Sequence, residues 1–180
     1  MTAASVASLA EAGALASLDI QLARTLMRLA GEVDERVALG VVAASRGLRA
    51  GHVCADLVAL GGQPIQDDDG VAVGALCWPE AGLWLAALRE SAVVGEADDW
   101  TPLVLDAAGR LYLRRYWTWQ HDLAQMLRRR ALAPADAVDG PLLKEGLDRL
   151  FLGPPPGSEH DMQRIAALLE VSGVLSRFLL

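Results

Sequence analysis

Cysteine, histidine and lysine are scarce in this 180-residue chain, and their scarcity excludes several kinds of site. Cys54 and Cys77 are the only cysteines, which is too few for a disulfide framework, and we expect both to be small core residues. Lys144 is the only lysine and follows Leu143. A phosphate-binding loop of the type G-x-x-x-x-G-K-[ST] needs its lysine directly after a glycine, so the sequence contains no such loop. We therefore predict that this chain has no complete catalytic site.

Long uncharged hydrophobic runs and a basic N-terminus are also missing. No stretch of 18 residues is free of charge, which argues against a membrane-spanning helix. The N-terminal residues carry Glu11 and Asp19 and no arginine or lysine before Arg24, unlike a secretory signal. We predict a soluble, cytoplasmic protein. Its net charge of −7 disfavours binding of a polyanion by the molecule as a whole.

Hydrophobic spacing predicts a mainly α fold with one small β-hairpin, that is, a compact α+β domain. The hairpin is expected at Leu103–Leu105 and Leu111–Leu113, joined by Asp106–Gly109, and it is the only strand pair that the pattern supports. Segment 51–60 remains ambiguous between a strand at His52–Cys54 and a helical turn, and residues 61–70 are expected to form a loop. Helices are predicted over residues 18–30, from Val33 to an end at Gly47 and then Gly51, from Pro79, over 116–127, from Pro141 and after Ser158.

Three small clusters could carry chemistry, but each has a simpler explanation. A structural zinc ion needs four ligands, and His52, Cys54 and Cys77 would need His121 from another element. A nucleophilic Cys54 activated by His52 would lack a third residue to orient it. Acidic residues 67–69 lie between glycines, where they are usually solvated. We predict no metal site and no catalytic residue.

The segment Arg110–Arg130 combines basic and aromatic residues. It contains six arginines and one acidic residue, Asp122, which gives a local formal charge of +5. Arginines interleaved with aromatics are typical of single-stranded nucleic acid binding. The spacing of the apolar residues instead favours a helix with a core-facing stripe: Tyr116, Trp119, Leu123, Met126 and Leu127. We favour the core stripe and keep a single-stranded DNA-binding module as the alternative.

Seven short segments resemble the N-terminal domain of RecD, the alpha subunit of the bacterial exodeoxyribonuclease V (RecBCD). They occur in the order and spacing of that family and span most of the chain. The segments are Leu18-Asp19-Ile20-Gln21, Gly51-His52-Val53-Cys54 with Leu57, Thr101-Pro102-Leu103-Val104-Leu105, Arg110-Leu111-Tyr112-Leu113, Arg115-Tyr116-Trp117, Leu147-Asp148-Arg149-Leu150-Phe151 and Gln163-Arg164-Ile165-Ala166.

The resemblance implies a three-part organisation. Residues 1–152 would form the N-terminal interaction domain, 153–157 a Pro/Gly joint, and 158–180 the beginning of the helicase motor. The rest of the motor, including its phosphate loop, lies outside this sequence. A complete RecD subunit is an ATP-driven 5′-to-3′ helicase that uses ATP and Mg; this chain alone would need no cofactor.

The resemblance also implies partners and sites. The domain would dock the subunit onto RecC, in a complex with RecB, and would meet DNA through that complex during double-strand break repair and recombination. Arginine and tryptophan often anchor protein interfaces, so Arg114, Arg115 and Trp117 are the expected partner-binding residues. Gln163 falls where the helicase family places a glutamine that reads the adenine of ATP.

Overall fold

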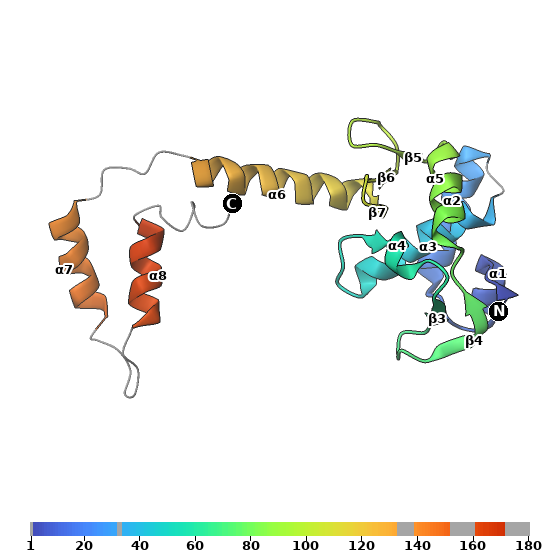
Figure 1. The fold of residues 1–180 in the computed structure, drawn as a ribbon, viewed down its shortest axis with the longest axis horizontal. Coiled ribbons are helices and arrows are strands. Elements are labelled where there is room, and N and C mark those ends of the chain that lie inside the picture. The colour runs from blue at the N-terminus through green and yellow to red at the C-terminus, as the bar shows by residue number, and fades with distance from the viewer. Residues whose placement is uncertain (1, 32–33, 133–138, 152–160, 172–180) are drawn as a thin grey trace. The chain divides into compact units, whose positions relative to one another are not determined.

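The computed structural model describes residues 2–31, 34–132, 139–151 and 161–171. It divides into two compact units, an N-terminal unit of residues 1–120 and a C-terminal unit of residues 121–180. Figure 1 shows their elements, whose helices predominate over short strands. The predicted α+β class, mainly helical, is therefore confirmed. No helix of the described residues is long and apolar enough to cross a membrane.

Helix α3 (Glu35–Arg49) lies at the centre of the N-terminal unit, packed beside α1 (Val6–Glu11) and α2 (Ser17–Ala30). Every residue from Val37 to Ser45 is buried. A side chain at Gly40 would come within 2.9 Å of Leu88, so the glycine lets its neighbours approach the helix closely. Both predicted helices are confirmed, but the second one continues through Gly47 to Arg49. Its end is followed by Gly51, with φ of +86°.

A four-stranded sheet contains the predicted hairpin and orders its strands β2-β7-β6-β5. The hairpin is β6 (Leu103–Leu105) and β7 (Arg110–Leu113), with Leu103 opposite Leu113. In its turn the Asp106 carboxylate accepts the N–H groups of Ala108 (3.0 Å) and Arg110 (2.9 Å). The ambiguous segment resolves into β2 (Ala55–Asp56) and α4 (Leu57–Leu60). Of the two alternatives, the helical turn is confirmed and the strand at His52–Cys54 is wrong. Strand β5 (Val94–Gly95) runs parallel to β6.

A second sheet was not predicted. It orders β1 (Thr2–Ala3), β4 (Ala72–Cys77) and β3 (Pro64–Gln66) as β1-β4-β3. Strand β4 has the sequence Ala-Val-Gly-Ala-Leu-Cys, in which only Cys77 is buried. Because it contains no polar side chain, it shows no alternation of apolar and polar residues, which is the pattern that predicts strands. Residues 61–63 and 67–70 form turns and loop, as predicted, but Pro64–Gln66 between them forms strand β3. The expectation of a single strand pair was wrong.

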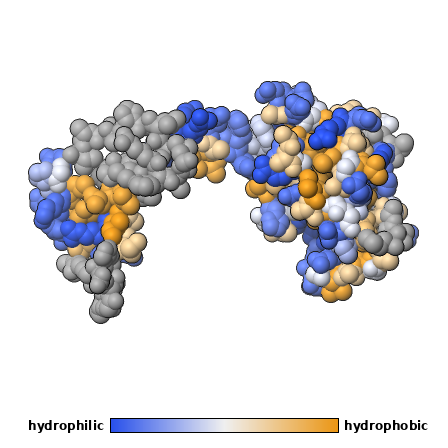
Figure 2. Space-filling model, in the orientation of Figure 1, coloured by the Kyte–Doolittle hydropathy of each residue, from blue (hydrophilic) through white to orange (hydrophobic). Residues whose placement is uncertain are grey.

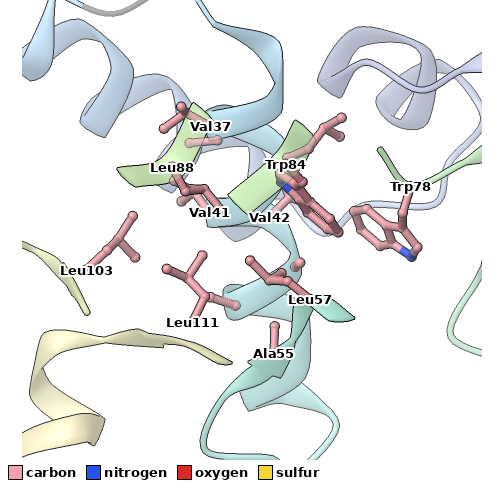
Figure 3. Close-up of a cluster of buried hydrophobic side chains, with 14 of the residues drawn as sticks. Val37, Val41, Val42, Ala55, Leu57, Trp78, Trp84, Leu88, Leu103 and Leu111 are labelled. Carbon is pink, nitrogen blue, oxygen red and sulfur yellow. The ribbon is translucent and has the colours of Figure 1, made fainter. Parts of the chain in front are cut away.

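The core of the N-terminal unit lies where α3, α5 (Ala81–Glu90) and the larger sheet meet (Figure 3). Trp84 is fully buried, stacks on Trp78 with ring centroids 5.4 Å apart, and donates its indole N–H to the Arg36 carbonyl (2.7 Å). The helix was predicted to begin at Pro79. It begins at Ala81 because the Glu80 carboxylate accepts the N–H groups of Gly82 and Leu83 and caps it.

The C-terminal unit contains most of α6 (Arg114–Leu132), together with α7 (Gly140–Leu150) and α8 (Met162–Val171). The last two helices contact each other, and Asp148 on α7 accepts from Lys144 (2.6 Å) and from Arg164 of α8. Hydrophobic residues gather over them in Figure 2. Pro141 lies in the first turn of α7, as predicted. The predicted joint at 153–157 and the expected cap Ser158 lie outside the described residues.

Candidate functional site

Arg114, at the start of α6, binds the loop between β5 and β6. Its guanidinium donates to the carbonyls of Ala97 (2.7 Å), Glu96 (2.9 Å) and Thr101 (3.0 Å) and to the Thr101 hydroxyl (3.2 Å). It also lies 5.6 Å from the centroid of the Trp117 ring. Arg114 and Trp117, two expected partner-binding residues, are thus brought together, and Arg114 holds the loop in place.

Arg115, the third expected partner-binding residue, points to another ring. Its guanidinium carbon lies 4.8 Å from the centroid of Trp119, which meets Tyr116 edge to face. Arg115 and Trp119 are exposed, whereas Tyr116 is half-buried. A cation over an exposed indole is stabilised by about 0.5–1 kcal/mol. This pair is therefore a weak internal contact and leaves both side chains accessible.

The apolar stripe of α6 exists but is not buried. Trp119, Leu123, Met126 and Leu127 are 43–55% exposed, so the expectation that they form a core stripe was wrong. Helical periodicity correctly placed them on one face, yet periodicity cannot say whether a face is covered. All residues of the helix from Thr118 to Arg130 are exposed.

Arg114 and Arg110, both in the basic segment, make polar contacts within the fold. Arg114 binds the loop, and Arg110 forms an ion pair with Asp106 (2.7 Å). Partial burial acts to raise the pKa of Asp106, but the hydrogen bonds from Arg110 and Ala108 outweigh it and lower the pKa below its usual value. The pair therefore stays charged at neutral pH, and less of the segment's positive charge is available to a phosphate backbone.

An open pocket of the N-terminal unit lies between the end of α3 and segment 51–60, and its wall includes His52 and Cys54. The arginine side chains in its wall, Arg46 and Arg49, already form ion pairs and hydrogen bonds within the protein. Arg49 pairs with Asp68 and with Asp19, each at 2.9 Å, and these hydrogen bonds raise the pKa of its guanidinium. Arg46 donates to the Gln66 carbonyl (2.7 Å). The pocket thus presents a network of closed ion pairs.

The other clusters named from the sequence show no assembled site. Cys77 is buried, Cys54 half-buried and His52 exposed. Asp67 accepts the N–H groups of Asp69 (3.0 Å) and Val71 (2.8 Å), which is turn geometry. Among the residues that the structure describes, no three His, Cys, Asp or Glu side chains group closely enough to hold a metal ion.

Gln163 lies in the first turn of α8, in the C-terminal unit, with an exposed side chain. Its N–H and that of Arg164 donate to the Asp161 carboxylate, both at 3.1 Å. Asp161 therefore caps α8 and fixes the start of the helix that carries Gln163.

The chain matches the family model described as "RecBCD enzyme subunit RecD, N-terminal domain" over residues 11–112, which is more than half of its length. The chain belongs to this family. The match extends from the end of α1 to β7 and so covers most of the N-terminal unit. Arg114, Arg115 and Trp117 lie just beyond it.

Curated relatives extend the similarity to the C-terminal unit. The RecBCD enzyme subunit RecD of Mycobacterium tuberculosis (strain H37Rv) is 39% identical over 168 residues, which cover 90% of this chain and 25% of the relative. That of Mycolicibacterium smegmatis is 34% identical over 177 residues, covering 88% of this chain and 30% of the relative. The chain thus spans about a quarter to a third of the length of these RecD proteins.

One exposed residue of this RecD N-terminal domain was missed from the sequence. Trp100, in the loop that Arg114 binds, is 98% exposed. It follows Glu96, Asp98 and Asp99, and a tryptophan in such a polar turn segment was the available signal. Helical or strand periodicity does not apply to a loop, so the spacing of apolar residues gives no prediction for Trp100.

Proposed function

We propose that this chain is the N-terminal docking domain of a RecD subunit and that it binds RecC within a RecBCD-type exodeoxyribonuclease V. The observation that carries the proposal is the family match over residues 11–112. The chain aligns with only 25–30% of each RecD relative and contains no phosphate-binding loop. We therefore infer that it is non-catalytic alone and contributes to double-strand break repair and recombination through the complete subunit, which would use ATP and Mg.

Exposed side chains on α6 support a binding role. Trp119, Leu123, Met126 and Leu127 line one face, and Arg115 lies over Trp119. Arginine and aromatic residues are enriched among the few residues that dominate protein interfaces. Within this proposal Arg115 contacts the partner directly. Arg114 and Trp117 act by holding the start of α6 and the β5–β6 loop together.

Co-purification with RecB and RecC of the same organism tests the docking function. We expect stable capture of the 180-residue chain by RecB and RecC, and weaker capture of its variants Arg115→Ala and Trp117→Ala. Leu29→Ala, an exposed leucine on α2, is the matched control and should be captured like the wild type. Failure of RecC to capture the wild-type chain would contradict the proposed function.

Direct binding of single-stranded DNA is the second candidate, and the Arg115–Trp119 pair favours it. An exposed indole beside a guanidinium can stack on a base while the cation meets a phosphate, and the exposed Arg128 and Arg129 add positive charge toward the end of α6. Such binding should weaken steeply with salt because counterions are released, whereas an apolar docking surface should respond much less. A titration of fluorescent oligothymidine at two salt concentrations separates the two functions.

For Gln163 we propose the family role, contact with the adenine of ATP in the complete subunit. Its place at the capped start of α8, with an exposed side chain, is compatible with this role. In the complete RecD subunit, Gln163→Ala should raise KM for ATP and leave kcat nearly unchanged. If the variant kept the KM for ATP and the preference for ATP over GTP of the wild type, this role would be contradicted.

A further inference from the structure

The loop between β5 and β6, Glu96–Pro102, carries the most exposed large hydrophobic residue of the described chain. The Trp100 side chain is 98% exposed, compared with 74% for Leu29 and 55% for Trp119. In Figure 1 this loop stands out from the rest of the N-terminal unit. A tryptophan carries a large apolar surface and is enriched at protein interfaces, so a tryptophan held almost wholly in water is a candidate anchor for a partner.

This loop is held in one conformation by several hydrogen bonds. Arg114 donates to three of its carbonyls and to the Thr101 hydroxyl. Within the loop, the Glu96 N–H donates to the Asp99 carboxylate (2.8 Å), and the Asp99 N–H donates to the Glu96 carbonyl (3.3 Å). Thr101 donates to the Leu103 carbonyl (2.8 Å).

Close packing adds to this order. A side chain at Gly95 would lie 2.6 Å from the Thr101 hydroxyl and 2.7 Å from the Asp99 side chain, so the two ends of the loop meet there. A loop that is already ordered loses little conformational entropy when it binds. Trp100 is therefore presented on a preorganised support.

The charge around Trp100 selects the kind of partner. Glu96, Asp98 and Asp99 are exposed, and the loop itself contains no basic residue, so its formal charge is −3, or −2 together with the bound Arg114 guanidinium. Three carboxylates beside the ring would repel the phosphates of a nucleic acid. They complement an apolar pocket with lysine or arginine at its rim, because interfaces pair opposite potentials and place aromatic anchors in pockets.

We propose that Trp100 is the anchor of a protein interface and that it inserts into an apolar, basic-rimmed pocket on RecC. This assignment rests on the proposed docking function and names the surface that carries it. The carboxylates of Glu96 and Asp98 meet the rim of the pocket. Arg114 is a positioning residue, because it acts on the partner only through the loop that it holds.

Binding of the complete chain to purified RecC, measured by titration calorimetry, tests the proposal. Loss of a central tryptophan anchor corresponds to at least roughly a 30-fold increase in Kd, and we expect this for Trp100→Ala. Trp100→Phe should recover part of the affinity. Leu29→Ala, which removes another exposed apolar side chain, should bind like the wild type. Since Trp100 makes almost no contacts, the variant should keep the wild-type circular dichroism and unfolding midpoint.

Two further variants test the charge and the support. Asp98→Lys should weaken binding, and the weakening should shrink as salt is added. Arg114→Ala should weaken binding less than Trp100→Ala and should speed hydrogen exchange at the loop amides, a readout that an intact loop would not show.

The outcomes separate the two proposals. If RecC binds the wild type and Trp100→Ala with the same Kd, the assignment of Trp100 is overturned while the docking function stands. If RecC does not bind the wild type, both are overturned. If Trp100→Ala abolishes binding of oligothymidine instead, the loop belongs to a nucleic acid site and the protein-pocket assignment is wrong.

Discussion

Asp19 is the most informative residue for testing how the N-terminal unit is held together. Its carboxylate is fully buried and accepts from the Ser45 hydroxyl (2.6 Å), Arg49 (2.9 Å) and the N–H of Ala16 (3.1 Å). One side chain thus joins the start of α2 to the end of α3, and Arg49 continues the network to Asp68. Replacing it should weaken several contacts at once.

The magnitude for Asp19→Ala follows from these partners. Removing one member of a buried ion pair costs about 3–5 kcal/mol when the other charge stays buried. Here the Arg49 side chain is 29% exposed and keeps Asp68, so it can rehydrate and the cost is lower. The lost bonds to Ser45 and Ala16 add to it. We expect the free energy of unfolding to fall by about 2–4 kcal/mol, and by about half as much for Asp19→Asn.

Urea unfolding followed by tryptophan fluorescence measures this loss. All five tryptophans lie at or before Trp119, so their signal reports the N-terminal unit alone. With a slope of about 2 kcal/mol per molar urea, the midpoint should drop by about 1–2 M. Glu11→Ala, which removes an exposed carboxylate, should stay within about 0.5 kcal/mol of the wild type. If Asp19→Ala lowered the free energy of unfolding by less than about 0.5 kcal/mol, the reasoning would be refuted.

Three further predictions concern packing and titration. Gly61→Ala should destabilise the N-terminal unit by about 1–3 kcal/mol in urea unfolding, because its new methyl group would lie 2.6 Å from the Ala81 side chain and 2.8 Å from the Ala81 nitrogen. Gly146→Ala, with open space around it, should not destabilise α7. A larger loss of stability for Gly146→Ala than for Gly61→Ala would contradict the packing. Burial, together with the neighbouring Cys54 sulfur, raises the pKa of Tyr112 to about 12. Since the folded pKa exceeds the unfolded value of about 10, this contribution to stability is complete below about pH 10 and is lost as the pH rises to about 12. Phenolate absorbance of the wild type should show a titration step near pH 12 that Tyr112→Phe removes. If the wild type showed no such step, the burial of Tyr112 would be contradicted. Trp84→Phe should cost about 1.5–3 kcal/mol through the lost bond to the Arg36 carbonyl and weaker stacking on Trp78, whereas Trp100→Phe should cost almost nothing; equal effects on the unfolding midpoint would show that the burial of Trp84 is unimportant.

The elements that depend on local sequence patterns were predicted most accurately. The helix from Leu18 to Ala30 and the hairpin around Asp106–Gly109 depend on nearby residues, namely helical spacing with a glycine end and a turn that needs a positive φ. Both were predicted correctly for that reason. Helix boundaries were less accurate, because the Glu80 carboxylate competes with Pro79 to define where α5 begins.

Contacts between distant segments could not be predicted in the same way. Strand β1 pairs with β4 although more than 60 residues separate them, and β4 lacks an alternating pattern. The burial of Asp19 likewise requires Ser45 and Arg49 from another helix. A buried carboxylate is stable only where such partners meet, and sequence order does not show which residues meet.

The candidate site shows the same division. The sequence by itself determined that the chain lacks a phosphate-binding loop, that Arg110–Arg130 is rich in arginine and aromatics, and that its segments resemble RecD. Only the tertiary structure decided that Arg114 is bound to the β5–β6 loop, 13 to 18 residues earlier in the chain, that the α6 stripe is exposed, and that Trp100 lies in solvent. The reason is physical: residue type and spacing specify which side chains share a local face, whereas burial depends on what the rest of the folded chain places against that face.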